Sequence, residues 1–346
     1  MSQDAAGKEI AMKPTIRDVA NMAGVSISTV SRVMNAPQTV VESKRLRVLE
    51  AIEKLKYQPN GFARGLIYKK SNTIGVMIPD IESMYYAGLI RGMQDAAVQL
   101  NCSLMFCNTD RDKDRLLSYI ENFYEKQVDG IIFASDALHP AYYEKMTRFH
   151  FPFVLASTHS LDYDIPSVDI DDESAAYAAV DYLAREGHRQ IGMISFPFGA
   201  MISGQPRYDG FVRALRDHGL EACAAHVEFA EHRYEHAYQA SRRLLEKAPN
   251  LTAVFAASDE FAMGAITAIQ DGGRSVPDDV SVIGFDNIRM ADMYIPKLST
   301  VAQPVYEIGI RAIQKLHELI TDGSVKQLRE KLPHKLIIRD SSKPLR

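Results

Sequence analysis

The first periodic segment of the chain covers residues 16–23, where apolar side chains recur at intervals of three and four. That spacing predicts a short helix with one buried face. Thr15 and Asp18 have the spacing of a capping box, and Gly24 follows as a turn residue. We therefore expect a helix that begins after Thr15 and ends at a glycine turn.

A second short helix is predicted over residues 27–34, with Ser26 as its N-cap. Its Val30 and Val33 would pack back onto the first helix. Two short helices around a glycine turn form a helix-turn-helix. A third helix is predicted over residues 43–55, with an inner face made of Leu46, Leu49, Ile52 and Leu55.

After residue 71 the pattern changes to short apolar runs that alternate with helical stretches. Such runs, rich in β-branched residues, predict parallel sheets covered on both faces. About 275 residues of this kind are too many for one small sheet, so we expect a body of two Rossmann-like α/β lobes. The runs lie at residues 73–78, 103–107, 130–134, 153–156, 190–195, 253–257 and 280–285.

The composition is that of an ordinary folded protein. Of the 346 residues, 46% are apolar and 24% are charged, which excludes wholesale disorder, collagen and coiled coil. No apolar run reaches the roughly 20 residues that span a bilayer, and the N-terminus lacks the apolar segment of a secretory signal. We expect a cytoplasmic protein without a membrane partner, whose three cysteines are free thiols: Cys102, Cys107 and Cys223.

Charge is divided unevenly along the chain. Residues 8–70 hold twelve Lys and Arg against five Asp and Glu, a balance of +7, whereas residues 71–346 carry −10. The basic module points to a polyanion, because Lys and Arg that neutralise phosphates release counterions; a solvated charged surface is the alternative. The exposed side chains of the second predicted helix suit DNA, since short hydroxyls allow close approach and arginine can read guanine: Ser28, Thr29, Ser31 and Arg32.

The run TIRDVANMAGVSISTVSRVMN at residues 15–35, followed by YQPNGFARGL at 57–66, resembles the lactose/galactose repressor family of bacterial transcription regulators. The likeness continues through IGVMIPDI, QVDGIIFAS, SDEFAMGAI and VSVIGFDN. It implies an all-α helix-turn-helix module and an α/β body similar to a periplasmic sugar-binding protein. The expected divisions are a disordered tail 1–13, a DNA-binding domain 14–58, a hinge 59–71, an N-lobe 72–168 plus 299–328, and a C-lobe 169–298 plus 329–346.

The resemblance implies roles on operator DNA. Ile27 and Ser28 would choose the operator bases, and Arg32 would read a guanine. Asn60 lies at the start of the hinge, where Leu66 matches the apolar wedge that enters the minor groove, with Ala63 beside it. The further DNA-binding residues are Thr15, Thr29, Ser31 and Asn35, the last three at phosphates.

One departure from the family lies at the start of the third helix. Val41 stands where a capping Ser or Thr is usual, and losing such a cap costs about 1 kcal/mol. A shifted helix start would let Thr39 or Ser43 take this role, and both alternatives stay open.

Ligands of open α/β lobes bind beyond the carboxyl ends of the strands. The residues there have hydroxyl or carboxylate groups that can hydrogen-bond a polyol, and two of them have aromatic rings that can stack on its apolar face. They are Asp80, Tyr85, Tyr86, Ser135, Ser157, Ser195, Ser258, Asp259 and Asp286. Asp259 could instead cap the following helix, and Ser135 and Ser157 could simply end strands. The resemblance implies effector contact for Arg207 as a clamping arginine, for Asp286 and for the ring of His232. Gln303 is a further effector candidate.

Signals of catalysis are missing from the sequence. It contains no G-x-G-x-x-G, no Walker loop and no G-x-S-x-G, so we expect neither an enzyme nor a cofactor. Residues 232–236 spell H-x-x-E-H, a zinc signature, but no third ligand stands out and no metal is expected.

Near-palindromic operators of this family imply a homodimer, with a sugar or sugar derivative bound between the lobes. Within the family, the body is most similar to the catabolite-control branch, whose corepressor is the phosphoserine form of the phosphocarrier protein HPr. Tyr306 and Glu307 match its corepressor surface, but Gln314 replaces its signature arginine. We therefore prefer a local sugar-operon repressor to a global regulator. A sugar-binding transport receptor is disfavoured by the basic module.

Overall fold

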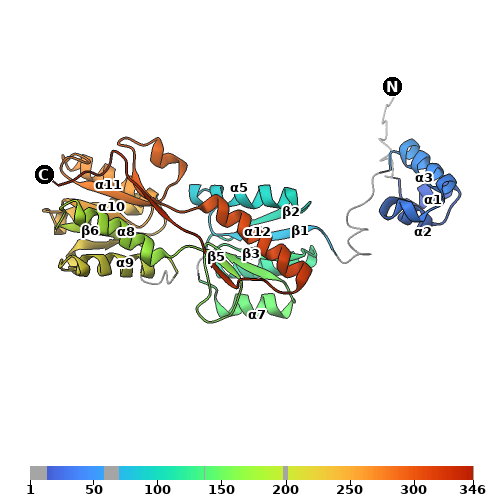
Figure 1. Cartoon of the computed structure of the whole chain (residues 1–346), viewed down its shortest axis with the longest axis horizontal. Coiled ribbons are helices and arrows are strands. Elements are labelled where there is room, and N and C mark those ends of the chain that lie inside the picture. Colours follow the sequence, from blue (N-terminus) through green and yellow to red (C-terminus); the bar gives the residue numbers. More distant parts are fainter. Residues whose placement is uncertain (1–13, 58–69, 136, 198–201, 346) are drawn as a thin grey trace, which may run out of the picture. The chain divides into compact units, whose positions relative to one another are not determined.

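The computed structural model describes residues 14–57, 70–135, 137–197 and 202–345 (Figure 1). The chain divides into two compact units, one ending at Ser71 and the other beginning at Asn72. The expected tail 1–13 and the hinge residues Asn60, Ala63 and Leu66 lie outside the described residues.

The first unit is a helix-turn-helix followed by a third helix. It consists of α1 (Ile16–Ala23), α2 (Ile27–Asn35), the 3₁₀ turn η1 (Pro37–Thr39) and α3 (Glu42–Leu55). The predicted capping box is confirmed, because the Asp18 amide donates to Thr15 Oγ1 and the Thr15 amide donates to the Asp18 carboxylate. Gly24 adopts the left-handed conformation, with φ 62°. Val19, Val30 and Val33 share one small core, as predicted.

The inner face of α3 agrees with the predicted one at Ile52 and Leu55, which pack against this core, and differs from it at the other positions. Val48 and Ala51 are buried, whereas Leu46 and Leu49 are 55% and 47% exposed. Packing against α1 and α2 selects the side of the helix with the smaller apolar residues. The N-cap is Val41, without a side-chain hydrogen bond, so neither Thr39 nor Ser43 replaces the missing cap.

The second unit contains two six-stranded sheets, confirming the prediction of two α/β lobes (Figure 1). The N-lobe sheet has the order β11-β5-β4-β3-β1-β2 and the C-lobe sheet β12-β10-β9-β8-β6-β7. Neighbouring strands are parallel except for β10 and β12. The N-lobe strands are β1 (Thr73–Ile78), β2 (Ser103–Asn108), β3 (Gly130–Phe133), β4 (Phe153–Ala156), β5 (Ser167–Asp169) and β11 (Arg329–Lys331). The C-lobe strands are β6 (Ile191–Ser195), β7 (Val227–Phe229), β8 (Ala253–Ala256), β9 (Ser281–Asp286), β10 (Ser299–Ala302) and β12 (Lys335–Ile337).

Helices cover both faces of each sheet. In the N-lobe, β1 places Ile74, Val76 and Ile78 in the core that α5 and α12 share, while Met77 packs into a separate core with α6 and α7. This alternation is the two-residue period of a strand. The N-lobe helices are α5 (Met84–Gln99), α6 (Lys113–Glu125), α7 (Pro140–Arg148) and α12 (Val305–Asp322). The C-lobe contains α8 (Asp172–Arg185), α9 (Gly204–Asp217), α10 (Tyr234–Lys247), α11 (Asp259–Asp271), and the short turns η2 (Ala224–His226) and η3 (Arg289–Asp292).

The chain crosses between the lobes three times, and all three predicted boundaries need correction. β5 ends at Asp169 in the N-lobe sheet, so the first crossing follows Asp169 and not residue 168. β10 pairs with β9 in the C-lobe sheet, so the second crossing follows Ala302 and not residue 298. β11 pairs with β5 in the N-lobe sheet, so the third crossing follows Lys331 and not residue 328. In each case the chain completes a short strand of three or four residues before it changes lobe, so the crossing lies after the predicted residue.

Among the residues that the structure describes, no helix combines the length and the apolar character that a transmembrane span requires. All three cysteines are free thiols and are partly buried, as expected.

Candidate functional site

The outward surface of α2 presents the side chains that the sequence analysis assigned to DNA. Ile27 is 43% exposed. Ser28, Arg32 and Asn35 are also exposed, and Thr29 and Ser31 are half-buried. Thr15 lies instead at the start of α1, where its hydroxyl belongs to the capping box. The helix thus offers short polar groups and one guanidinium on a single exposed surface, which is what a major-groove helix needs.

Hydrogen bonds along α2 hold several of these side chains in place. Ser26 Oγ lies 2.8 Å from Ser28 Oγ and accepts the Thr29 amide at 3.2 Å, which makes Ser26 the N-cap as predicted. Arg32 Nε donates weakly to the Ser28 carbonyl at 3.4 Å, and Asn35 Nδ2 donates to the Ser31 carbonyl at 2.9 Å. These local bonds order the surface before any partner is bound.

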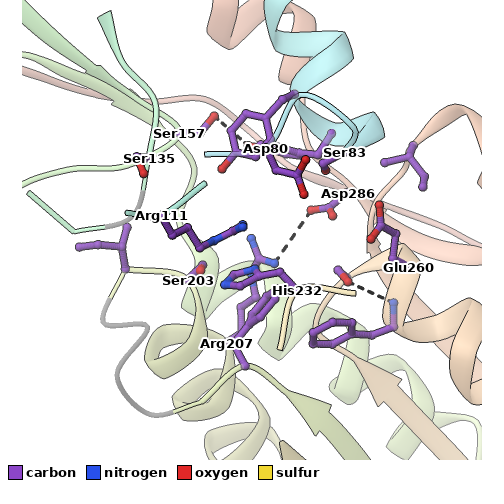
Figure 2. A pocket seen from close by; sticks show the side chains of 17 residues that line it. Asp80, Ser83, Arg111, Ser135, Ser157, Ser203, Arg207, His232, Glu260 and Asp286 are labelled. Carbon is purple, nitrogen blue, oxygen red and sulfur yellow. Dashed lines mark hydrogen bonds and ion pairs between the residues drawn. The ribbon is translucent and has the colours of Figure 1, made fainter. Parts of the chain in front are cut away.

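A polar pocket lies between the two lobes of the body (Figure 2). The N-lobe contributes the segments after β1, β2, β3 and β4, and the C-lobe contributes those after β6, β7, β8 and β9. This is the strand-end position at which open α/β sheets bind ligands. The lining residues are Asp80, Ser83, Tyr85, Tyr86, Arg111, Ser135, Ser157, Phe196, Ile202, Ser203, Arg207, His232, Ser258, Glu260, Phe261, Asp286 and Ile288.

The Arg207 side chain is held in this pocket by several contacts. It is 6% exposed, and its Nε donates to Asp172 Oδ1 at 2.7 Å. Its Nη1 donates to the Ala257 carbonyl at 2.5 Å, and its guanidinium carbon lies 3.7 Å from the centre of the Phe285 ring. Burial acts to lower the pKa of Arg207, but Asp172 and Asp286 hold that pKa above its usual value. The guanidinium is therefore a fixed positive charge.

Asp286 accepts a hydrogen bond from Gln303 Nε2 at 2.7 Å, and Arg207 Nη1 lies 3.9 Å from the same oxygen. Burial raises the pKa of Asp286, although Arg207 opposes this shift. Tyr85 extends the network into the N-lobe, because its hydroxyl donates to Ser157 Oγ at 2.8 Å and lies 3.4 Å from Gln303 Oε1. A chain of polar contacts thus joins the two lobes at the pocket.

Three residues at this site have backbone conformations that favour glycine. Ser157 has φ 59°, Asp286 has φ 113° and Asn287 has φ 56°. Such conformations cost of the order of 1–3 kcal/mol each and persist where the surrounding structure enforces them. The strain supports a functional role for the ends of β4 and β9.

Aromatic rings line the pocket from both lobes. The rings of Tyr85 and Tyr86 meet edge to face at 5.2 Å in the N-lobe. In the C-lobe, Phe196 lies 4.6 Å from the His232 ring and 4.7 Å from the Phe261 ring. Apolar rings beside fixed hydrogen-bonding groups form a pocket suited to a small polar ring with apolar faces.

Of the twelve candidates predicted from the sequence, nine line this pocket: Asp80, Tyr85, Tyr86, Ser135, Ser157, Arg207, His232, Ser258 and Asp286. Gln303 lies behind Asp286 as its hydrogen-bond donor. The alternative reading of Asp259 as a cap is wrong, because Ser258 is the N-cap of α11 and Asp259 accepts from the Ile288 amide and the Thr300 hydroxyl. Ser195, another strand-end candidate, is completely buried.

Sequence reasoning missed several lining residues, notably Glu260, Arg111, Ser83 and Ser203. Arg111 follows the end of β2, so the strand-end rule would have found it had β2 been included. Glu260 lies in the first turn of α11, where acidic residues are common, so no local signal marks it as a pocket residue. In the H-x-x-E-H segment, His232 lines the pocket, and His236 Nδ1 lies 3.8 Å from Glu231. No cluster of three metal-ligating side chains occurs among the residues that the structure describes.

Two family profiles together match almost the whole chain. Residues 15–60 match "Bacterial regulatory proteins, lacI family". Residues 71–340 match "Periplasmic binding proteins and sugar binding domain of LacI family". The second match begins at residue 71, next to Asn72, where the second structural unit begins.

Known proteins resemble the chain over nearly its full length. It is 40% identical to catabolite control protein A of Priestia megaterium, over 96% of this chain and 100% of that protein. The lac repressor dimer bound to operator and the anti-inducer ONPF superposes with a TM-score of 0.85 at 26% identity, covering 95% of this chain and 99% of that one. A complex of the transcriptional regulator CelR with cellobiose has a TM-score of 0.74 at 28% identity, covering 95% and 100%.

Proposed function

Because the chain belongs to the LacI family of bacterial regulatory proteins, we propose that it represses a local set of carbohydrate-utilisation genes under the control of one sugar. The observation that carries the proposal is the buried pair of Arg207 and Asp286, fixed between aromatic rings in the pocket between the lobes. A guanidinium and a carboxylate held side by side can donate to and accept from adjacent hydroxyls of one sugar.

In this proposal the protein is a cytoplasmic homodimer whose α2 helices read a near-palindromic operator. Arg207, Asp286 and Gln303 hold the effector, the Tyr85 and Tyr86 rings flank it, and its binding changes the relation of the two lobes. That change alters the spacing between the hinge segments (residues 59–71) of the two protomers. It thereby shifts the fraction of the dimer that can bind operator DNA. No bond is made or broken.

Identity to catabolite control protein A favours a second candidate, a global regulator with phosphoserine-HPr as corepressor. Tyr306 is 46% exposed on α12, and its hydroxyl donates to Asp95 at 3.0 Å. Gln314 gives this surface a neutral amide, and the neighbouring Arg311 is already bound to Glu330 at 2.8 Å. A phosphoserine would lack a free bidentate partner at this point, so we prefer the local repressor.

Fluorescence anisotropy with a labelled near-palindromic operator carrying a central CpG step tests both candidates. We expect tight, salt-dependent binding that one sugar of a panel releases. Binding that tightens only with phosphoserine-HPr would establish the second candidate. A chain that ignores DNA yet binds sugar would indicate a transport receptor, and turnover of the sugar would indicate an enzyme.

A further inference from the structure

Two carboxylates from opposite lobes face the pocket between the lobes. Asp80 follows β1 in the N-lobe, and Glu260 lies in the first turn of α11 in the C-lobe. Figure 2 shows Asp80, Glu260 and Asp286 on one side of the opening, with Arg111 on the other side. The pocket therefore has an acidic wall that both lobes build.

The three carboxylates of this acidic wall, Asp80, Glu260 and Asp286, differ in the hydrogen-bond and ion-pair partners that they have. Asp286 has Arg207 and Gln303 as partners, and Asp80 Oδ1 accepts the Glu82 amide at 2.9 Å. Glu260 is half-buried and makes no hydrogen bond or ion pair with any residue of the described ranges. Burial raises the pKa of Glu260, and the charge of Asp80 raises it further.

Two of the three arginines near Glu260 have other partners. The Arg207 guanidinium is bound to Asp172 and the Ala257 carbonyl, and the Arg233 guanidinium lies 3.6 Å from Glu82. Burial and the charges of Asp80 and Glu235 raise the pKa of Glu260 by more than the charges of Arg233 and Arg111 lower it, so the net shift is upward. A ligand that enters the pocket thus meets a carboxylate that is open to a new partner.

Carboxylates only accept hydrogen bonds, and one sugar hydroxyl has only one proton to donate. An ammonium group has three protons and a positive charge, so a single group can bond to both lobes and offset the repulsion between the carboxylates. Resting on the sugar-binding function proposed above, we propose that the effector is an amino sugar whose protonated amine lies between Asp80 and Glu260. Its hydroxyls would then reach Arg207 and Asp286.

Isothermal titration calorimetry on the full chain, with three probes for each common hexose, tests this assignment. The probes are the hexosamine, its parent hexose, which replaces the amine by a hydroxyl of similar size, and its N-acetyl derivative, which removes the charge and adds an acetyl group. We expect one hexosamine to bind at least about tenfold more tightly than its two neutral counterparts, as a charge-assisted hydrogen bond predicts.

The Glu260→Gln variant should lose this preference, because the amide keeps the shape but not the charge. Glu144→Gln, an exposed change on α7 away from the pocket lining, should retain it. Binding of the hexosamine should also release protons at slightly acidic pH, since the ammonium favours the ionised form of Glu260.

Equal affinity for a parent hexose and its hexosamine, unchanged in Glu260→Gln, would overturn the amino-sugar assignment while leaving the sugar-controlled repressor intact. Tighter binding of sugar phosphates than of amines would overturn it too. An operator-binding chain that responds to no sugar of any charge would contradict the sugar-controlled repressor itself.

Discussion

Arg207 donates a hydrogen bond from Nε to Asp172 Oδ1 over 2.7 Å, at a point where both side chains are almost completely buried. The contact joins the start of α8 to the first turns of α9, so the residue that faces the pocket is held by the C-lobe framework. Breaking a buried ion pair by removing one partner leaves the other charge without compensation.

We therefore expect Arg207→Met to lower the free energy of unfolding by roughly 3–5 kcal/mol, as is typical when one partner of a buried pair is removed. Adding Asp172→Leu should restore part of this loss, because it removes the unpaired carboxylate. Urea denaturation followed by far-UV circular dichroism measures both. An unchanged urea midpoint in the single variant would show that the pair contributes no stability.

The α5 and α12 helices cross at two glycines, which gives a second prediction. A Cβ on Gly92 would lie 2.0 Å from the Tyr306 carbonyl oxygen, and one on Gly309 would lie 2.2 Å from that of Leu89. Gly92→Ala must therefore push the helices apart, and we expect a loss of roughly 1–3 kcal/mol in the free energy of unfolding. Thermal unfolding of the full chain measures the effect.

Gly88→Ala is the matched control on the same helix. Its Cβ would meet only Val305 at 3.6 Å, an ordinary contact. Since alanine favours a helix over glycine by about 1 kcal/mol, this variant should be as stable as the original or more so. Equal stability of Gly92→Ala and Gly88→Ala would show that the close approach of α5 and α12 does not require glycine at position 92.

The third prediction concerns the missing cap of α3. Val41 is 68% exposed at the N-cap and makes no side-chain bond there. Val41→Ser should stabilise the helix-turn-helix unit by about 1 kcal/mol, because serine can accept one of the free amides of the first turn. Hydrogen exchange in the full chain should show stronger protection of α3 amides and no change in the body. Val41→Ala, which adds no acceptor, is the control.

Strand prediction from sequence succeeded where strands are buried on both faces. β1 and β4 were predicted to the residue, because they consist of apolar or small residues from end to end. β5, β7, β10, β11 and β12 were missed, since they have only three or four residues and include polar ones such as Ser167 and Arg329. Their pairing depends on neighbouring strands, which a local pattern does not contain.

The same limit applies to the functional site. Ser157 and Asp286 could be found from the strand-end rule, because their positions follow from the strand pattern itself. Glu260 could not, since nothing local distinguishes a pocket carboxylate from the usual acidic residue in the first turn of a helix. Likewise, α3 has apolar residues on two sides, so only contact with α1 decides that Val48 is buried and Leu46 is exposed.

The fourth prediction is a pH dependence of stability. Burial raises the pKa of Asp286 to about 7 in the folded protein, whereas an aspartate in an unfolded chain titrates near 4. The stabilising contribution of the protonated form is therefore complete below about pH 4 and is lost as the pH rises through about 7. Asp286→Asn should remove this part of the pH-dependent loss of stability, because an amide side chain does not titrate. Urea midpoints of both proteins across this range measure it, and parallel profiles would show that Asp286 ionises normally.

The last prediction concerns Arg32 as a base-reading residue. In the free protein its guanidinium is exposed and makes only a weak bond at 3.4 Å to the Ser28 carbonyl, so little is lost when it turns toward DNA. If it reads a guanine, Arg32→Ala should weaken operator binding about ten- to a hundredfold and remove discrimination at one symmetric base pair. Lys54→Ala, on α3 and already paired with Glu50 at 2.7 Å, should change affinity equally for all sequences. Anisotropy titrations against operators altered at single positions measure both. An equal loss on every operator for Arg32→Ala would mean that Arg32 contacts a phosphate and that specificity comes from Ile27 and Ser28 alone.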